Sequence, residues 1–138
     1  MVAEDLLDEA RKAMASAYAP YSGFSVGAAL LAEDGTVWTG CNVENASFGL
    51  TVCAERVAVF GAVLGGRRDF ALLALVTAAD EAIPPCGACL QVLSEFAPEL
   101  RVISQGRGQP VEWSLDDLLP ERFGPSSGWL SRSDEKAT

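Results

Sequence analysis

The sequence predicts an α/β protein in which one sheet is covered by helices on both faces. Segments with helical periodicity alternate along the chain with short apolar runs of strand length, an order typical of layered α/β proteins. A length of 138 residues suits one domain, and 49% hydrophobic with 21% charged residues is an ordinary globular composition. No internal repeat or linker interrupts the sequence. These three observations predict one domain with one covered sheet.

The first predicted element is an amphipathic helix over residues 4–18, in which apolar residues recur with helical spacing. A proline and a glycine then end it, because the residue before proline leaves the α region and glycine favours a turn. Two extended runs follow, over residues 24–31 and 36–43. Asp34-Gly35 between them is a strong hairpin signal. We expect these two strands to pair antiparallel.

The second half of the chain repeats the alternation of helix and strand. A second helix is predicted over residues 52–64, closed by two glycines, and a buried strand over 70–77. Paired prolines precede a third helix over 86–96, which ends before another proline. A short strand at 101–104 and a short helix capped by Ser114 complete the pattern.

The ends and the cysteines of the chain suggest a compartment. We expect residues 1–123 to form the domain and 124–138 to be a polar tail, rich in Ser, Gly and charge. No apolar run approaches the ~20 residues of a membrane-spanning helix, and the acidic N-terminus is unlike a signal peptide. The expected location is therefore the cytoplasm, with no membrane partner. There, cysteines are expected as thiols or metal ligands rather than disulfides.

Charge and composition exclude several functions. A formal net charge of −9 would repel a phosphate backbone, so no nucleic-acid partner is expected. The sequence contains no histidine, which excludes His-dependent nucleophilic triads and every His-containing zinc site. Any metal must be held by Cys, Asp or Glu.

Three cysteines and a glutamate cluster at two predicted helix starts. Cys53-Ala54-Glu55 opens one helix, and a Pro-Cys-Gly-Ala-Cys run containing Cys86 and Cys89 opens another. Three protein ligands leave the fourth tetrahedral position of zinc open for water, which distinguishes a catalytic site from a closed structural one. The N–H groups and dipole of a helix N-terminus stabilise thiolates. The sequence therefore predicts one Zn²⁺ per chain, held by these three cysteines.

The charge of three thiolates calls for a cation near the metal. A favourable zinc site lowers the pKa of water from about 16 to ~7, and the extra thiolate charge opposes this effect. Helix termini contribute only ~0.3–2 kcal/mol, which does not offset a full charge. Arg56 follows Cys53 by three positions, and we expect it to hydrogen-bond the sulfurs and compensate their charge. The alternative is that Arg56 is a solvated helix residue.

Two other interpretations of the cysteines remain open. Cys41 could complete a structural site with four thiolates, although such sites usually pair two CxxC motifs and this sequence has one. A single buried thiol on a strand is the other account of Cys41. Cys86 and Cys89 could instead be a redox pair, although a redox pair does not require a Cys-Ala-Glu motif elsewhere.

The order Cys-Ala-Glu and then Pro-Cys-Gly-Ala-Cys matches the signature of zinc deaminases, in which the glutamate is not a ligand. At this point the chain resembles the small-chain cytidine deaminases. The resemblance extends from the first helix to about Phe123 and is carried by four segments in order: Tyr21-Ser22-Gly23-Phe24-Ser25-Val26-Gly27-Ala28-Ala29-Leu30, Gly40-Cys41-Asn42-Val43-Glu44-Asn45-Ala46-Ser47, Cys53-Ala54-Glu55-Arg56 and Pro85-Cys86-Gly87-Ala88-Cys89.

The resemblance implies a three-layer α-β-α fold with one mixed sheet of about five strands, and a homotetramer. It assigns catalysis to Glu55 and implies a nucleoside pocket formed by Phe24, Asn42, Glu44, Phe48, Ala54 and Phe123. Asn42 and Glu44 would hold the ribose hydroxyls. Phe24 and Phe123 would bracket the sugar and base, with Phe123 supplied by a neighbouring subunit. Phe48 is a departure, because family members usually carry tyrosine there; by residue type alone, the aromatic positions could be core or interface.

The activity implied by the resemblance is hydrolytic deamination of free cytidine and deoxycytidine to uridine and deoxyuridine plus ammonia, in pyrimidine salvage. Glu55 would take a proton from the attacking water, deliver it to N3 of cytosine and then protonate the departing ammonia. Two alternatives stay open. A nucleic-acid-binding zinc module or editing deaminase would need a basic stripe, for which Gly66-Arg67-Arg68 is the nearest candidate. A deaminase for an antibiotic such as blasticidin would share the metal motifs.

Overall fold

A five-stranded mixed sheet forms the middle layer of the fold, which a computed structural model describes for residues 1–124. The strands follow the order β2-β1-β3-β4-β5 across the sheet. β3 and β4 run parallel, and the other neighbouring pairs are antiparallel. The predicted mixed sheet is therefore confirmed. The bounds are β1 Val26–Ala32, β2 Val37–Cys41, β3 Phe70–Thr77, β4 Arg101–Gln105 and β5 Val111–Ser114.

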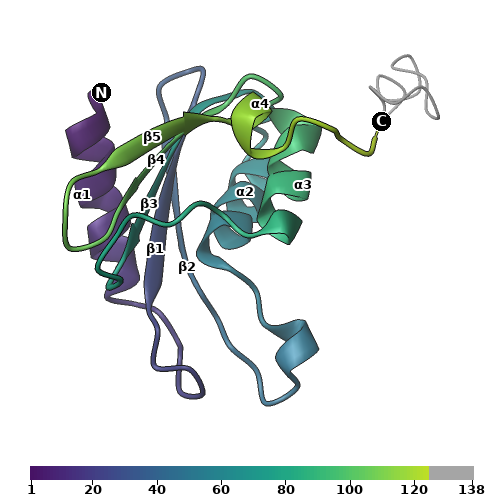
Figure 1. The fold of residues 1–138 in the computed structure, drawn as a ribbon. Coiled ribbons are helices and arrows are strands. Elements are labelled where there is room, and N and C mark those ends of the chain that lie inside the picture. The colour runs from purple at the N-terminus through teal and green to yellow at the C-terminus, as the bar shows by residue number, and fades with distance from the viewer. Residues whose placement is uncertain (125–138) are drawn as a thin grey trace.

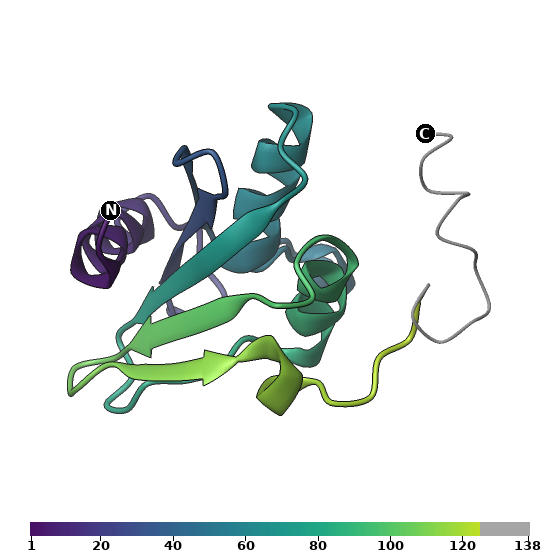
Figure 2. The ribbon, with the colours of Figure 1, turned by 90° about the horizontal axis from the view of Figure 1, so that it is seen from above.

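Helices cover both faces of the sheet, which confirms the predicted three-layer α-β-α arrangement. The helices are α1 Ala3–Met14, α2 Ala54–Leu64, α3 Gly87–Phe96 and α4 Leu115–Leu118, with a 3-10 turn η1 at Phe48–Leu50. α1 lies on one face, while α2 and α3 lie on the other (Figure 1), and Figure 2 shows the same layers from above. Each face has its own core: Leu6 of α1 is buried on one side, and Val59 and Leu93 are buried on the other.

The predicted hairpin joins β1 and β2, and its turn sets their register. Gly35 has a φ of 89°, in the left-handed region that glycine adopts without strain. The Asp34 carboxylate accepts a hydrogen bond from the Thr36 N–H at 3.1 Å, which closes the turn. In the resulting register Gly40 pairs with Ala28. Both small residues lie on the face that α2 covers.

The first helix is shorter than predicted. α1 ends at Met14 instead of residue 18, and Tyr18 pairs with Val43 as an isolated bridge. The Tyr18 N–H donates to the Asn42 carbonyl at 3.0 Å, and the Tyr18 carbonyl accepts from the Glu44 N–H at 2.9 Å. These contacts take the backbone groups that a longer helix would use. The prediction was wrong here because helical periodicity carries no information about pairing with a distant segment.

The fifth strand was not located by the sequence pattern. β5 is an edge strand of 4 residues that pairs antiparallel with β4, placing Trp113 opposite Val102. Its Val-Glu-Trp-Ser alternation after a glycine-rich turn is a strand signal, but a weak one at that length. The next residue behaves as predicted, since the Ser114 hydroxyl accepts from the Asp117 N–H at 3.1 Å and caps α4.

The end of the described chain contacts α3. The segment after α4 runs away from the sheet and past α3 (Figure 1), where Gln91 Nε2 donates to the Phe123 carbonyl at 2.8 Å. The predicted polar tail, 124–138, lies outside the described residues from residue 125 onward. Within residues 1–124, no helix has the length and apolar character needed to cross a membrane.

Candidate active site

The starts of α2 and α3 each carry a cysteine at the N-cap. Cys53 precedes α2 and Cys86 precedes α3, and both have extended backbone conformations with ψ of 155° and 165°. Cys89 lies in the first turn of α3, three positions after Cys86, so that both side chains share one side of the helix. The first N–H groups of a helix have no intrahelical partner and favour anions. The predicted helix starts are confirmed to within two residues.

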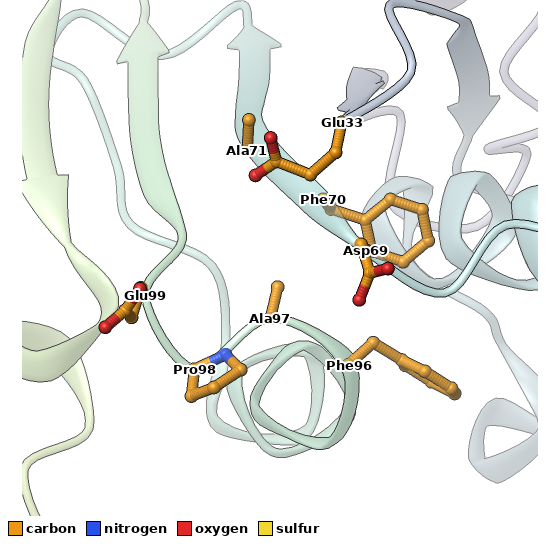
Figure 3. A pocket seen from close by; sticks show the side chains of 8 residues that line it. All are labelled: Glu33, Asp69, Phe70, Ala71, Phe96, Ala97, Pro98 and Glu99. Atoms are coloured by element: carbon orange, nitrogen blue, oxygen red, sulfur yellow. The ribbon is translucent and has the colours of Figure 1, made fainter.

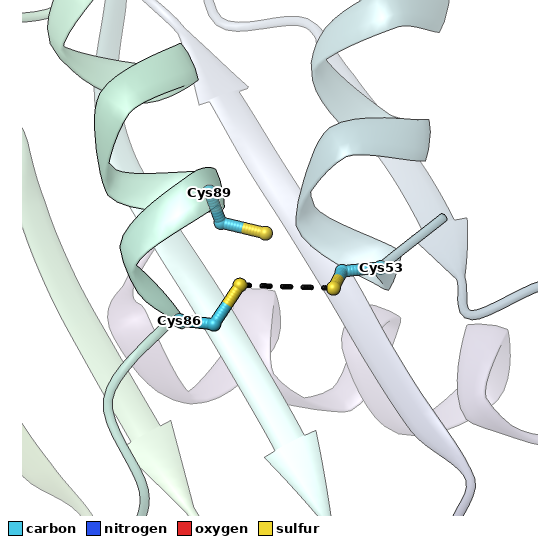
Figure 4. A group of neighbouring side chains, drawn as sticks. All are labelled: Cys53, Cys86 and Cys89. Carbon is cyan, nitrogen blue, oxygen red and sulfur yellow. Dashed lines mark hydrogen bonds between the residues drawn. The ribbon is translucent and has the colours of Figure 1, made fainter. Parts of the chain in front are cut away.

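The three thiols converge from these two helices. Figure 4 shows the side chains of Cys53, Cys86 and Cys89 pointing toward one another. Their sulfurs all lie within 4.8 Å of one another, and the Cys53 and Cys86 sulfurs are 3.8 Å apart. Sulfurs about 2.3 Å from a tetrahedral zinc would be separated by about 3.8 Å. The cluster therefore fits one zinc ion per chain.

The alternative uses of the cysteines do not match this geometry. Cys41 lies at the end of β2 and, among the residues described, is not a member of the cysteine group. A structural site with four thiolates is thus not assembled. All four cysteines fall within residues 1–124, and each is a free thiol there. Cys86 and Cys89 therefore group with Cys53 rather than standing apart as an isolated pair.

Arg56 extends the cluster on the α2 side. Its Nη2 donates to Cys53 Sγ at 3.3 Å. Hydrogen bonds lower the pKa of Cys53 to about 5, and the bond from the Cys89 thiol contributes more than the bond from Arg56. Burial opposes this shift. The hydrogen bond to Cys53, followed by burial, raises the pKa of the Cys89 thiol. Arg56 thus contacts the sulfur cluster, as predicted, instead of projecting into solvent.

Glu55 is the buried carboxyl beside this cluster. It is 5% exposed and sits in the first turn of α2. Burial is the main reason that its pKa is raised to about 7, and the Cys53 thiolate raises it further. A carboxyl group in this position can both accept and donate a proton near neutral pH.

Asn42 and Glu44 lie beyond β2 and hold the loop before β1. The Asn42 side chain accepts from the Val26 N–H at 2.9 Å and donates to the Phe24 carbonyl at 2.8 Å. Glu44 Oε1 accepts from the backbone N–H groups of Tyr21 at 3.0 Å and Ser22 at 3.1 Å, and Oε2 accepts from the Ser22 hydroxyl. These hydrogen bonds hold the pKa of Glu44 below its ordinary value, and the bond from the Ser22 hydroxyl contributes most.

Tyr21 and Ser22 were not singled out by the sequence as partners of Glu44. The signal for them is weak, because a contact across 22 or 23 residues leaves no local pattern. Asn42 and Glu44 are nonetheless brought close to the start of α2. Val43, which separates them, forms an isolated antiparallel bridge with Val52, directly before Cys53.

The predicted aromatic contacts are exposed in the single chain. Phe24 is 37% exposed, Phe48 73% and Phe123 68%, so none of the three is a core residue. Phe48 packs edge-on against Tyr21 with ring centroids 5.8 Å apart. Ala54, by contrast, is fully buried at the start of α2. The core alternative for Phe24 and Phe123 is therefore wrong for this chain.

A pocket of about 270 Å³ lies at the opposite end of α3. Figure 3 shows Phe70 and Phe96 beside it, with the carboxylates of Glu33, Asp69 and Glu99 around its rim. It shares no residue with the thiol cluster, which is open to solvent through Cys86. We place the chemistry at the thiols, because within residues 1–124 metal ligands and a buried carboxyl meet only there.

The family model for the cytidine and deoxycytidylate deaminase zinc-binding region matches residues 1–105. The chain belongs to the cytidine deaminase family. The cytidine deaminase of Sporosarcina psychrophila is 46% identical over 125 residues, which cover 89% of this chain and 92% of the relative. That of Halalkalibacterium halodurans is 48% identical over 120 residues, covering 86% of this chain and 91% of the relative.

Solved structures of cytidine deaminases agree with the fold. The crystal structure of cytidine deaminase from Burkholderia pseudomallei has a TM-score of 0.87 and 48% identity, and the match covers 89% of this chain and 100% of that one. The similarity to blasticidin-S deaminase of Bacillus cereus is lower, at 30% identity over 106 residues, covering 71% of this chain and 76% of that protein.

Proposed function

We propose that this member of the cytidine deaminase family hydrolyses the exocyclic C–N bond of free cytidine and deoxycytidine, giving uridine or deoxyuridine and ammonia. The carrying observation is that three thiols and one buried carboxyl meet at the starts of α2 and α3. Cys53, Cys86 and Cys89 would hold the zinc ion. When bound, zinc supplies Lewis-acid activation of the attacking water.

Glu55 moves the protons of this reaction. It accepts a proton from the attacking water and delivers it to N3 of cytosine, which makes C4 electrophilic. It then transfers a second proton, from the hydroxyl group now on C4, to the departing amine as the C–N bond breaks, so that one water is consumed and one ammonia released for each nucleoside. A single carboxyl can serve every step because its burial raises its pKa to about 7, so that it can both accept and donate a proton.

Arg56 compensates the negative charge of the three thiolates. Its guanidinium lies 3.3 Å from Cys53 Sγ, a distance at which a full positive charge stabilises a thiolate directly. Without that charge, the sulfurs would weaken the electrophilic character of the metal. Arg56 therefore acts through the metal ligands rather than on the substrate.

The sugar is bound at the end of β2, by the same side chains that hold the loop before β1. An amide has two N–H donors and two acceptor positions, and Asn42 uses one of each on the backbone of Phe24 and Val26. Glu44 likewise retains acceptor capacity beyond its contacts with Tyr21 and Ser22. The remaining groups suit hydroxyls of a free ribose, with Ala54 and Phe48 close to the base and sugar.

We further propose that the chain is active as a homotetramer in which Phe123 reaches a neighbouring pocket. The exposed apolar residues support an assembly: Leu64 is 90% exposed, Phe60 51% and Phe123 68%. In this arrangement residues 1–123 form the domain. The proposed setting is pyrimidine salvage in the cytoplasm, a reducing compartment in which free thiols persist.

Substrate profiling with metal analysis tests the proposal. Purified protein is assayed by the ultraviolet change on cytidine, deoxycytidine, cytosine, CMP, blasticidin S and a cytosine-containing polynucleotide. We expect one zinc per chain and turnover of the two free nucleosides. Turnover of blasticidin S alone would favour the antibiotic deaminase, and turnover of polynucleotide cytosine alone would favour an editing enzyme. Protein that takes up zinc but leaves every one of these substrates unchanged contradicts the proposal.

A further inference from the structure

Gly40, on β2, packs directly against the backbone at the start of α2. A Cβ atom at this position would lie 2.6 Å from the backbone nitrogen of Ala58 and even nearer the carbonyl oxygen of Ala54. Ordinary van der Waals contact begins near 3.4 Å. The backbone of α2 therefore rests directly on Gly40. Ala54 and Ala58 are completely buried, each with 0% exposure. Ala28, which pairs with Gly40, is equally buried.

This contact fixes the position of the residues at the helix start. Ala54 stands between Cys53 and Glu55 in the chain, and a helix backbone moves as a unit because of its hydrogen bonds. A side chain at position 40 would push Ala54 away from the sheet and carry Cys53 and Glu55 with it. The obstacle is backbone, which cannot turn aside as a flexible side chain can.

Gly106, just after β4, packs closely against the backbone of the loop that leads to the other half of the site, the Cys86–Cys89 segment. A Cβ atom there would lie 2.7 Å from the Glu81 carbonyl oxygen and nearer still to the carbonyl oxygen of Ala79. Ala79 also accepts from the Arg107 N–H at 2.9 Å, which ties this loop to the end of β4. The loop leads from β3 to Cys86, so Gly106 supports the segment that delivers the second group of thiols.

We infer that Gly40 and Gly106 are positioning residues of the zinc site, which together set the separation between the Cys53 segment and the Cys86–Cys89 segment. The inference rests on the zinc site of the proposed function. Metal–ligand distances tolerate errors of only about 0.2 Å. Loss of residues that orient ligands typically weakens metal affinity about 10- to 100-fold. An added methyl group at either glycine would displace the neighbouring ligand segment and so weaken zinc binding.

The test is the zinc affinity of Gly40→Ala and Gly106→Ala, measured by competition with a chromophoric chelator. We expect affinity to fall about 10- to 100-fold. Cobalt-substituted protein should show altered sulfur-to-cobalt charge-transfer bands. Both readouts are independent of turnover. Each is measured at a temperature where the variant is folded by circular dichroism.

Gly27→Ala is the matched control. A Cβ atom at Gly27 would lie 2.6 Å from the backbone nitrogen of Met14 and nearer still to the Ala10 carbonyl oxygen. It would therefore press on the backbone of α1, as a Cβ at Gly40 would press on α2, but on the opposite face of the sheet. This variant should lose stability and keep its zinc affinity. Gly65→Ala adds a second control at the far end of α2, where the new Cβ would clash with the Trp38 ring.

Wild-type affinity in Gly40→Ala, or an equal loss of affinity in Gly27→Ala, overturns the inference, because the effect would then be absent or merely one of stability. If Gly40→Ala does not fold, Gly106→Ala decides in its place, since it intrudes on a loop and leaves the helix intact; wild-type affinity there overturns the inference. A wild-type protein that binds zinc but does not turn over cytidine contradicts the proposed function alone, because the affinity comparison still stands.

Discussion

The two faces of the sheet differ in how their helices are stabilised. α1 has acidic residues in its first turn and basic residues in its last, and its outer side carries ion pairs between Arg11 and Asp8 at 2.8 Å and between Lys12 and Glu9 at 3.2 Å. α2 and α3 have no basic residue in the last turn, and thiols occupy their N-caps. Local rules thus explain the charge pattern of α1, while α2 and α3 carry thiols at their N-caps, where metal ligands are needed.

The difference indicates that one face supports the fold and the other also carries the chemistry. Substitutions on the α1 face should therefore change stability alone. Those at the starts of α2 and α3 should change zinc binding or turnover with little change in folding. Five experiments test this division, from the largest expected effect to the smallest.

Glu55→Gln should have the largest effect on turnover. It removes the only proton carrier that we assign to the reaction, so kcat should fall by more than the ~10²–10⁴-fold usual for one proton-transfer group. The isosteric amide should leave the fold and the zinc content unchanged. Steady-state kinetics and metal analysis of the same preparation measure both quantities. Turnover within tenfold of wild type would remove Glu55 from its assigned role.

Cys86→Ser should abolish tight zinc binding, because a hydroxyl is a much poorer zinc ligand than a thiolate. Cys41→Ser is the matched control, since Cys41 lies on β2 outside the thiol group. It should retain one zinc per chain. Metal analysis after dialysis against a weak chelator compares the two. Retained zinc in Cys86→Ser, or lost zinc in Cys41→Ser, would contradict the ligand assignment.

Leu6→Ala should destabilise the fold without affecting the site. Leu6 belongs to α1 and is fully buried against the sheet, and truncation of such a residue costs about 2–5 kcal/mol of the free energy of unfolding. Leu93 on α3 is 1% exposed, so Leu93→Ala should cost a similar amount and also weaken zinc binding. Urea denaturation and zinc titration separate the two effects. Equal zinc affinities in the two variants would break the division between the faces.

Arg56→Gln should weaken the site by a smaller amount. A hydrogen bond to a charged group contributes about 1.5–3 kcal/mol, which corresponds to roughly 10- to 100-fold in zinc affinity or kcat. Arg68→Gln at the other end of α2 is the control, because Arg68 donates to the Val63 carbonyl far from the thiols. Chelator competition and kinetics on both proteins give the comparison. Equal changes in zinc affinity and kcat in the two variants would show that Arg56 is an ordinary surface arginine.

Phe123→Ala should affect substrate binding most and zinc binding not at all. Aromatic stacking on a base contributes roughly 1–3 kcal/mol, so KM should rise about 5- to 100-fold. The residue is 68% exposed in one chain, so stability should change little. Light scattering at the assay concentration accompanies the kinetics. An active monomer would refute the shared pocket and leave the roles of the thiols and Glu55 intact.

Local signals in the sequence predicted most of the face that carries the chemistry. The bounds of β3 agree with the predicted strand at both ends, and α2 and α3 begin within two residues of their predicted starts. Paired prolines, paired glycines and the cysteine motifs all lie next to the boundaries they mark. The zinc ligands could be predicted for the same reason, because each thiol stands at a helix start.

Long-range contacts account for what the sequence did not predict. Tyr18 leaves the helical conformation to pair with Val43, and β5 takes its partner from β4. The hydrogen bond between Asn42 and Phe24 joins residues 18 positions apart, and the one between Ser22 and Glu44 joins residues 22 positions apart. None of these contacts leaves a periodic pattern, because each depends on the assembled sheet and not on neighbouring residues.

The cysteine N-caps link metal binding to the local opening of the helices. In the described chain, neither Cys53 nor Cys86 forms the side-chain hydrogen bond that Ser or Asp would provide as a cap. Such a cap contributes about 1 kcal/mol. The first turns of α2 and α3 therefore open more easily than the turns that follow, and a ligand that joins their thiols holds both closed at once. Amide hydrogen exchange at residues 54–56 and 87–89 should slow on zinc addition, while exchange in α1 stays constant.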